Sequence, residues 1–191
     1  MARRARLDKT RVIEEAARLI NEQDLGHLSL GCLAERLGVR VPSLYNHVAG
    51  LSGLKRDLAL YCLRELLARL TRSVIGKARG EAILAFALTY REYAREAPSH
   101  YALTLQAPDF NDDELQNVAW QIVEIVLAVL EPYKLGEQEA IHAIRGLRSI
   151  VQGFISLEMV GGFGMPIDVD ASFHWLISLF ISALEQPAGT L

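Results

Sequence analysis

Hydrophobic residues recur along this chain at the three- and four-residue intervals that are typical of amphipathic helices. The spacing predicts helices over about 8–22, 30–37, 41–48, 51–75, 80–96, 99–106, 112–133, 137–161 and 169–185. The second half of the chain has no segment with the strict alternation of a β-strand. We therefore expect an all-α protein.

The most informative segment is 29–47, with the sequence SLGCLAERLGVRVPSLYNH. Ser29 is placed to cap a short helix. Four apolar residues then share one helical face: Leu30, Leu33, Ala34 and Leu37. Gly38 allows a tight turn, Val39 is expected to enter the core, and Pro42 fits the first turn of a second helix, where its missing N–H costs nothing. This pattern predicts a helix-turn-helix, in which the second helix enters the major groove of DNA.

The charge distribution agrees with this interpretation. The net charge of the 191 residues is -3, but residues 1–56 carry ten Lys and Arg against six Asp and Glu, whereas the remaining residues carry ten against seventeen. Binding to phosphates is favoured where the positive charge is concentrated on the contacting surface. Arg3, Arg4 and Arg6 precede the first helix, and form either an arm that reaches DNA or a solvated tail.

Composition restricts the class of protein further. The hydrophobic content of 51% is ample for a core, and the length fits one large or two small domains. There is no apolar run of membrane-spanning length, and no apolar segment follows the basic start of the chain, so we expect a soluble, cytoplasmic protein with no membrane partner. Cys32 and Cys62 have no disulfide or zinc-ligand spacing, and both are expected to be buried thiols.

The residues expected to face outward from the second helix are the candidates for reading DNA. Asn46 carries the donor and acceptor pair that matches adenine, Ser43 is adaptable, and Val41 can touch a thymine methyl group. Arg40 lies at the helix edge. Leu44 and Val48 are expected to point inward, with a spacing of four residues.

The segment LSLGCLAERLGVRVPSLYNHV, preceded by an amphipathic helix that ends in DLGHLS, resembles the DNA-binding domain of the TetR family of transcriptional regulators. The residues that carry the resemblance follow the pattern G-V-x-x-x-x-L-Y-x-H-V and are Gly38, Val39, Leu44, Tyr45, His47 and Val48. The resemblance implies a homodimer that binds double-stranded DNA through an N-terminal domain, 1–50. It also implies that a larger helical domain, 51–191, dimerises and binds a small-molecule inducer.

The resemblance also extends the set of candidate DNA contacts. Many members of the family have a Lys that meets phosphate where this chain has Leu51, so Lys55 or Arg56 would have to substitute for it. Tyr45 either packs its ring on the core or offers its hydroxyl to a phosphate, and His47 either contacts phosphate or packs at the helix end. The full candidate set is Ser29, Arg40, Val41, Pro42, Ser43, Tyr45, Asn46, His47, Lys55 and Arg56.

The last two predicted helices indicate dimerisation. Gly146, Ser149 and Gly153 form a stripe of small residues that lets another helix approach closely, and the final helix is apolar on more than one face. The alternative is a fully buried helix in a monomer, but one short recognition helix reads few bases alone, which favours a dimer with a four-helix bundle. The predicted dimerisation residues are Gly146, Ser149, Gly153, Phe173, Leu176, Ile177, Phe180 and Leu184.

The segment GLRSIVQGFISLE, followed by a Gly-rich loop and an apolar helix, resembles a subgroup of the family, the WHG-domain regulators. Gln152 and Gly153 stand at the His-Gly place of the pattern, and no Trp is nearby. A ligand role of that His therefore does not transfer to this chain.

Aromatic residues with polar tips in the second half predict a mostly apolar site for a small molecule. The candidates are Phe86, Tyr90, Trp120, Glu124 and Gln152, although aromatic residues at helical spacing are more often plain core. The long helix 51–75 would join this sensor to the DNA-reading helices, as a mechanical link or as a rigid connector.

Catalytic, metal and cofactor sites are not indicated. His142 and His174 lie on two helices without metal-ligand spacing. Asp168 and Asp170 are close enough in sequence to be metal ligands, but the Asp before Ala171 is better explained as the cap of the last helix, and Asp112 as an acidic residue at a helix start. We expect a ligand-responsive transcriptional repressor rather than an enzyme. The alternatives are an activator of the same fold, or a helical small-molecule-binding protein or enzyme whose basic end is incidental.

Overall fold

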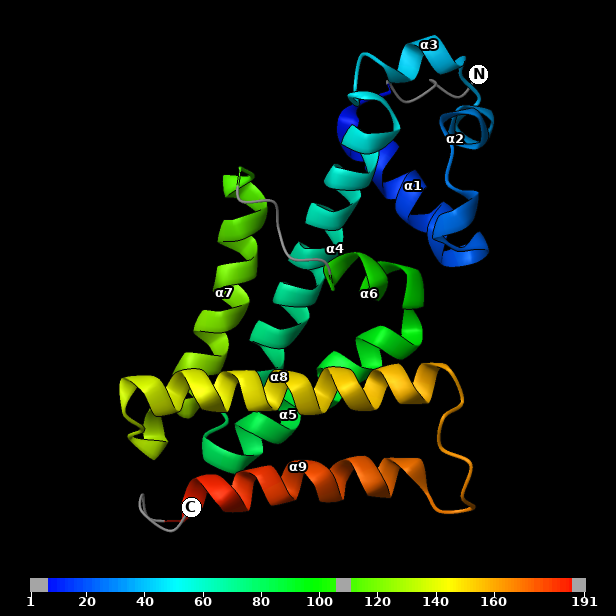
Figure 1. Cartoon of the computed structure of the whole chain (residues 1–191). Helices are drawn as coiled ribbons and strands as arrows, with labels where there is room; N and C mark the ends of the chain where they lie inside the picture. The colour runs from blue at the N-terminus through cyan, green and yellow to red at the C-terminus, as the bar shows by residue number, and fades with distance from the viewer. Residues whose placement is uncertain (1–6, 106–110, 187–191) are drawn as a thin grey trace. The chain divides into compact units, whose positions relative to one another are not determined.

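The computed structural model describes residues 7–105 and 111–186, which contain helices and no strand. The helices that belong wholly to the N-terminal part are α1 (Lys9–Gln23), η1 (Leu25–His27), α2 (Leu30–Leu37) and α3 (Val41–Leu44). They are followed by α4 (Gly50–Val74), α5 (Arg79–Glu96), α6 (Pro98–Thr104), α7 (Asp113–Leu130), η2 (Glu131–Tyr133), α8 (Glu137–Met159) and α9 (Val169–Glu185) (Figure 1). The predicted all-α fold is confirmed. The basic residues 3, 4 and 6 lie outside the described residues.

The chain divides into two compact units. The first unit consists of residues 1–65 and 97–116, and the second of residues 66–96 and 117–191. The chain passes from the first to the second within α4. These units are defined by how densely their residues contact one another, and not by function. The boundary at residue 50 between a DNA-binding and a ligand-binding domain therefore stays a prediction.

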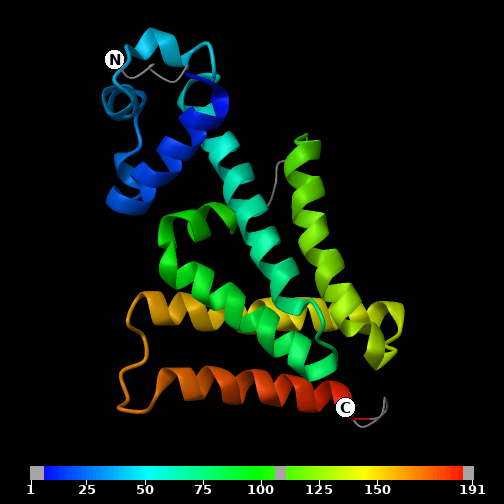
Figure 2. The ribbon, with the colours of Figure 1, turned by 180° about the vertical axis from the view of Figure 1, so that it is seen from behind.

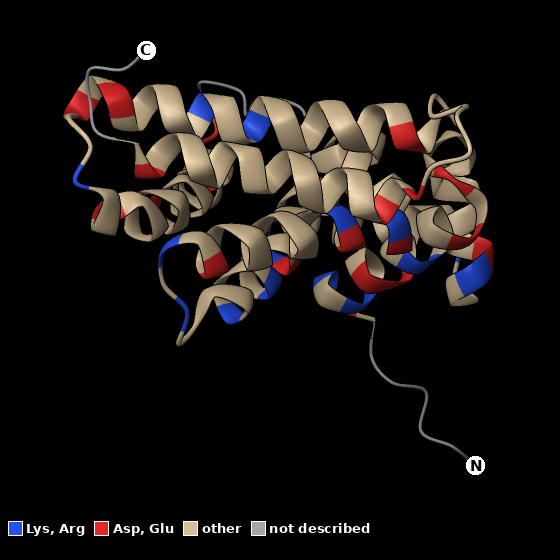
Figure 3. Ribbon diagram, turned by 90° about the horizontal axis from the view of Figure 1, so that it is seen from below, with Lys and Arg blue, Asp and Glu red and all other residues tan. Residues whose placement is uncertain are grey.

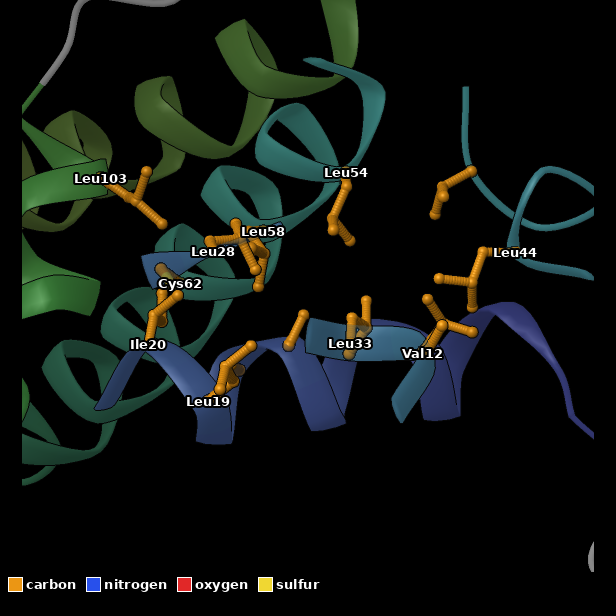
Figure 4. Close-up of a cluster of buried hydrophobic side chains, with 14 residues drawn as sticks. Val12, Leu19, Ile20, Leu28, Leu33, Leu44, Leu54, Leu58, Cys62 and Leu103 are labelled. Atoms are coloured by element: carbon orange, nitrogen blue, oxygen red, sulfur yellow. The ribbon is translucent and has the colours of Figure 1, made fainter. Parts of the chain in front are cut away.

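The core of the first unit lies among α1, α2, α4 and α6. It is made of aliphatic side chains that lie together in Figure 4, among them Val12, Ile20, Leu33, Leu44, Leu54, Leu58 and Leu103. Removal of such side chains from water is the main favourable contribution to folding. The predicted core positions of the helix-turn-helix are confirmed, because Leu33, Leu44 and Val48 are buried and Val39 packs against the same core.

The second unit is built on α5, α8 and α9, which pack on one another. Helices α8 and α9 run side by side in opposite directions (Figures 1 and 2). Gly80 of α5 allows α9 to pack closely, because a Cβ there would lie 2.9 Å from Cγ2 of Ile181. A Cβ at Gly146 of α8 would lie 3.5 Å from Cε2 of Phe180, which is ordinary van der Waals contact.

Three predicted features need correction. Helix α3 ends at Leu44 rather than Val48, because the chain must turn into α4 and uses turn hydrogen bonds from the N–H groups of residues 47 and 48 to the carbonyl of Leu44. Helix α7 ends at Leu130 and continues as η2, because Pro132 has no N–H to donate. Cys32 is exposed rather than buried, whereas Cys62 is buried as expected.

Candidate nucleic-acid interface

The helix-turn-helix is fixed by local hydrogen bonds. Ser29 caps α2, and its Oγ accepts a hydrogen bond from the N–H of Cys32 at 3.2 Å. Gly38 ends α2 in the left-handed conformation with φ of +65°, and the N–H of Val39 donates to the carbonyl of Ala34 at 2.9 Å. Glycine adopts this conformation without the steric cost of a Cβ. The turn therefore has one geometry, and it sets the direction of the segment that follows.

The segment that follows, 40–47, presents all of its side chains except Leu44 wholly or partly to solvent, and we call these exposed side chains the row 40–47. Arg40, Pro42, Tyr45 and Asn46 are exposed, and Val41, Ser43 and His47 are partly exposed. The inward residues Leu44 and Val48 anchor the row to the core. The structure thus brings seven of the ten predicted DNA-contacting residues together in 40–47. Tyr45 has 60% of its surface exposed, so its ring is not packed on the core.

Lys55 and Arg56 lie on the second turn of α4 in different environments. Lys55 is exposed. The guanidinium of Arg56 faces three carboxylates: its Nε and Nη2 donate to Asp112 at 2.7 Å each, its Nη2 donates to Glu114 at 2.8 Å, and its Nη1 lies 3.3 Å from Asp57. This guanidinium holds the pKa of Asp112 down at about 2. Any phosphate would have to compete with these carboxylates for Arg56.

Two residues that sequence reasoning missed, Arg36 and His100, bind to α1, the helix that packs against α2 of the helix-turn-helix. Arg36 of α2 donates to Glu15 and to Glu22 of α1, each at 2.7 Å, and it lowers the pKa of both carboxyl groups. His100 of α6 is buried, with its Nε2 3.0 Å from the carbonyl oxygen of Ala17 in α1. The residues joined by these hydrogen bonds are 14 to 83 positions apart, so no local sequence pattern predicts the contacts.

The predicted small-molecule residues are only partly brought together. Phe86 and Tyr90 of α5 have ring centroids 6.1 Å apart, and Nε2 of Gln152 in α8 donates to the hydroxyl of Tyr90 at 3.3 Å. Trp120 and Glu124 are instead exposed on α7, with Trp120 57% exposed. These two residues are solvent-facing rather than enclosed.

Two clefts lie beside α9 in the part of the second unit that the structure describes. One, of about 630 Å³, is lined by Leu88, Arg91, Glu92, Arg95, Glu96, Asp170 and His174. The other, of about 650 Å³, is mostly apolar and is lined by Phe154, Leu157, Phe163, Ile167, Ala171, Ser172, Trp175 and Leu176. None of the five predicted small-molecule residues lines either cleft.

The predicted dimerisation residues divide into exposed and internal ones. Ser149 and Gly153 are exposed, and Leu176, Phe180 and Leu184 are partly exposed. Phe173 and Ile177 have no exposed surface in the single chain, because they pack against the core of the second unit. They cannot be part of a surface that another copy covers. Gly146 faces Phe180 of its own chain.

Two exposed apolar residues of α9 were not in the predicted set. Trp175 is 66% and Leu179 is 47% exposed. Figure 3 shows that α8 and α9 are mostly uncharged along their middle, apart from the two arginines of α8. The apolar spacing of the last helix would have predicted Trp175 and Leu179 as exposed residues if the helix face that carries Phe173 and Ile177 had been assigned to the core.

No helix in the described ranges has the length and hydropathy needed to cross a membrane. Within residues 7–105 and 111–186, no three His, Cys, Asp or Glu side chains gather as metal ligands would. The cap of α9 is Asp168 rather than the expected Asp170, and Oδ1 of Asp168 accepts from the N–H of Asp170 at 2.8 Å. Asp112 lies directly before α7, as expected of an acidic helix start, and its Oδ1 accepts from the N–H of Leu115 at 3.1 Å.

Comparison with known proteins identifies relatives along almost the entire chain. Residues 83–180 match the model of the tetracyclin repressor-like C-terminal domain. An uncharacterized HTH-type transcriptional regulator of Mycobacterium tuberculosis is 32% identical over 97% of this chain and 85% of its own length. A second, YobS of Bacillus subtilis, is 33% identical over 96% of each chain. Membership of the WHG subgroup stays a prediction.

Solved structures agree with these relatives. A TetR variant of Acinetobacter baumannii AYE, solved in complex with minocycline, is 25% identical and superposes with a TM-score of 0.70 over 94% of this chain and 97% of that one. A protein of unknown function from Rhodococcus sp. RHA1 has the same fold, with a TM-score of 0.81 and 20% identity over 97% of this chain and the whole of that one.

Proposed function

This chain belongs to the TetR family of transcriptional regulators, and we propose that it is a homodimeric repressor that a small molecule releases from a near-palindromic operator. The observation that carries the proposal is the exposed row 40–47, which is held by a capped helix, a left-handed glycine and two buried anchors. Its side chains are of the types that read base edges and bind phosphates in the major groove.

The residues of the row have different roles in the proposed complex. Arg40 and Asn46 are exposed side chains with the donors and acceptors that recognise guanine and adenine. Tyr45 and His47 bind phosphates. Lys55, rather than Arg56, supplies the remaining phosphate contact, because Arg56 is occupied by carboxylates.

A dimer supplies the second reading unit. Helix α3 has four residues, so a single copy can contact few base pairs. On the surface of α8, Ser149 and Gly153 leave room, and a Cβ at Gly153 would meet nothing within 4 Å. We assign the large exposed side chains of Trp175 and Leu179 to the contact with the second copy, where they would lie against this small-residue stripe. Aromatic residues are enriched at such interfaces.

The effector is proposed to bind in the second unit. The TetR variant of Acinetobacter baumannii was solved with minocycline, which supports a small organic molecule as the effector of this chain. The proposed contacts are Tyr90 and Gln152, which are partly exposed and carry hydrogen-bonding groups, with the buried ring of Phe86 packed beside Tyr90. Binding would select a separation of the two reading units that no longer fits successive major grooves of operator DNA in the cytoplasm.

Fluorescence anisotropy with DNA taken from upstream of the chain's own gene tests the proposal. Affinity should fall steeply with salt, by roughly a thousandfold between about 50 and about 200 mM, because phosphate contacts release counterions. Arg40→Ala and Asn46→Ala should each weaken binding by about 1 to 3 kcal/mol, roughly 5- to 150-fold.

The matched control is Arg72→Ala, which removes an exposed arginine from the last turn of α4 in the second unit. It should leave the affinity unchanged. If Arg40→Ala and Asn46→Ala bind as tightly as Arg72→Ala at every salt concentration, the row 40–47 does not read DNA.

A further inference from the structure

The cleft of about 630 Å³ beside α5 and α9 has an arginine in its wall that is almost completely buried. The side chain of Arg91 is only 4% exposed. Its Nε and Nη2 donate to the two carboxylate oxygens of Glu158, at 2.8 and 2.6 Å. Its guanidinium carbon lies 4.9 Å from the ring centroid of Phe173 and 5.3 Å from that of Phe154. Two rings and a bidentate carboxylate therefore fix the orientation of this guanidinium.

A second arginine stands one turn further along the same helix face. Arg95 also lines the cleft, and it is exposed. Two guanidiniums on successive turns, one of them rigid, form a site that favours a planar carboxylate. The rigid partner is already ordered before any ligand arrives, which lowers the entropic cost of binding.

The place between the two arginines is taken by a carboxylate of the chain itself. Oδ1 of Asp170 accepts from Nη2 of Arg91 at 2.7 Å and lies 3.4 Å from Nη1 of Arg95. The side chain of Asp170 is 61% exposed, and the arginines lower its pKa. Arg91 keeps its pair with Glu158 when Asp170 turns to solvent, so an incoming carboxylate can replace Asp170 without leaving a buried charge unpaired.

We propose that this cleft is a binding site for a small organic monocarboxylate, whose carboxylate replaces that of Asp170 between Arg91 and Arg95. The volume lies in the range of small-molecule sites, and Leu88 gives the organic part an apolar contact. His174, one turn after Asp170 on α9, provides a further hydrogen-bonding group.

The acidic residues of the cleft restrict the ligand to a single negative charge. Glu158 offsets the charge of Arg91, so Arg91, Arg95 and Glu158 together offer one net positive charge to a ligand that replaces Asp170, and Glu96 is paired with Arg69. Glu92 is exposed on the rim, where it opposes a dianion such as phosphate. The site therefore prefers an aromatic or aliphatic monocarboxylate to inorganic phosphate.

The site goes beyond the proposed effector cluster at Phe86, because it uses other residues and a charged ligand. It connects to regulation through α9. The bond between Asp170 and Arg91 ties the first turn of α9 to α5, and α9 also carries Trp175. This last link rests on the proposed dimer, whereas the binding of a carboxylate does not.

Isothermal titration calorimetry of the full chain with sodium benzoate tests the site. Asp170→Asn removes the internal competitor, and should bind benzoate about tenfold more tightly than the wild type if Asp170 occupies the site most of the time. Arg95→Gln should weaken benzoate binding in both backgrounds. Inorganic phosphate should bind more weakly than benzoate to each variant.

Asp113→Asn is the matched control, because it removes an exposed carboxylate from the first turn of another helix, α7. It should bind benzoate as the wild type does. Should Asp170→Asn fail to fold, the Nε–Hε NMR signals of Arg91 and Arg95 in the wild type decide the question, since benzoate should shift both. The proposal is overturned if Asp170→Asn binds no more tightly than Asp113→Asn, if Arg95→Gln has no effect, or if phosphate binds as well as benzoate. None of these results depends on DNA binding or dimerisation.

Discussion

At Gly38 a single residue sets the geometry of the helix-turn-helix. Its φ of +65° lies in the left-handed region, although a Cβ would meet no atom within 4 Å. The requirement for glycine therefore comes from backbone conformation and not from crowding. Gly31, in the first turn of α2, has ordinary helical geometry and only one contact near a Cβ, 3.8 Å from Oγ of Ser29.

Gly38→Ala should lower the free energy of unfolding by about 1 kcal/mol, because alanine adopts positive φ only with strain. Gly31→Ala should leave it unchanged or raise it slightly, because alanine favours the helix. Urea unfolding followed by circular dichroism measures both. Equal stability of the two variants would mean that the turn at Gly38 does not constrain the fold.

Asp112 gives the first unit a dependence on acid pH. Arg56 holds the pKa of Asp112 at about 2, below the ordinary value of 3.8. A lowered folded-state pKa contributes stability that is complete above the unfolded value and is lost as pH falls through the folded one. The wild type should therefore lose stability between about pH 4 and pH 2.

Asp112→Asn removes this contribution, so its melting temperature should fall less between pH 4 and pH 2 than that of the wild type. Thermal unfolding at a series of pH values measures the difference. Asp113→Asn, next to it, is the control, and should keep the wild-type slope. Parallel slopes for all three proteins would show that Arg56 does not stabilise the charged form of Asp112.

At the scale of elements, the outer face of α9 carries the proposed contact between two copies. Trp175 is 66% and Trp120 of α7 is 57% exposed, so the chain offers two similar tryptophans, of which only one lies on the proposed interface. Loss of a central aromatic anchor often costs an interface more than 1 kcal/mol.

Trp175→Ala should raise the dimer dissociation constant by about tenfold or more, whereas Trp120→Ala should leave it unchanged. Sedimentation equilibrium over a range of protein concentrations measures both constants. If Trp120→Ala dissociates the dimer and Trp175→Ala does not, the interface lies on α7 rather than on α9.

Most elements could be predicted from the sequence because their signals are local. The cap at Ser29, the turn at Gly38 and the apolar spacing of α2 act within a few residues of each other, and all appear in the structure. The predicted end of α3 was wrong because the position of that end depends on how the chain turns into α4, and not on the helix propensity of its residues.

The features of the candidate sites that the sequence did not predict depend on contacts between residues far apart in the chain. Arg56 has the charge of a phosphate-binding residue, but two of the three carboxylates that surround it, Asp112 and Glu114, are 56 and 58 residues away. Phe173 and Ile177 have the same apolar character as Trp175, and only the packing of α9 decides which of them face inward. Arg91, Glu158 and Asp170 likewise come from three helices.

At the scale of the whole molecule, the sequence joins an N-terminal part with an excess of positive charge to a longer part with an excess of negative charge. Only the surface that meets DNA needs to be positive, because phosphate contacts provide most of the sequence-independent affinity. The proposed repressor needs two reading units on one duplex, since each recognition helix is short.

Hydroxyl-radical footprinting on a DNA fragment selected from a random library by the full chain shows whether two copies bind one duplex. Two protected regions centred about one helical turn, or a whole number of turns, apart are expected on a near-palindromic site, because two copies would fill major grooves on one face. Arg40→Ala should lose both regions together, whereas Arg72→Ala should keep them. A single protected region, a selected site without inverted symmetry, or no selected sequence at all would contradict the account.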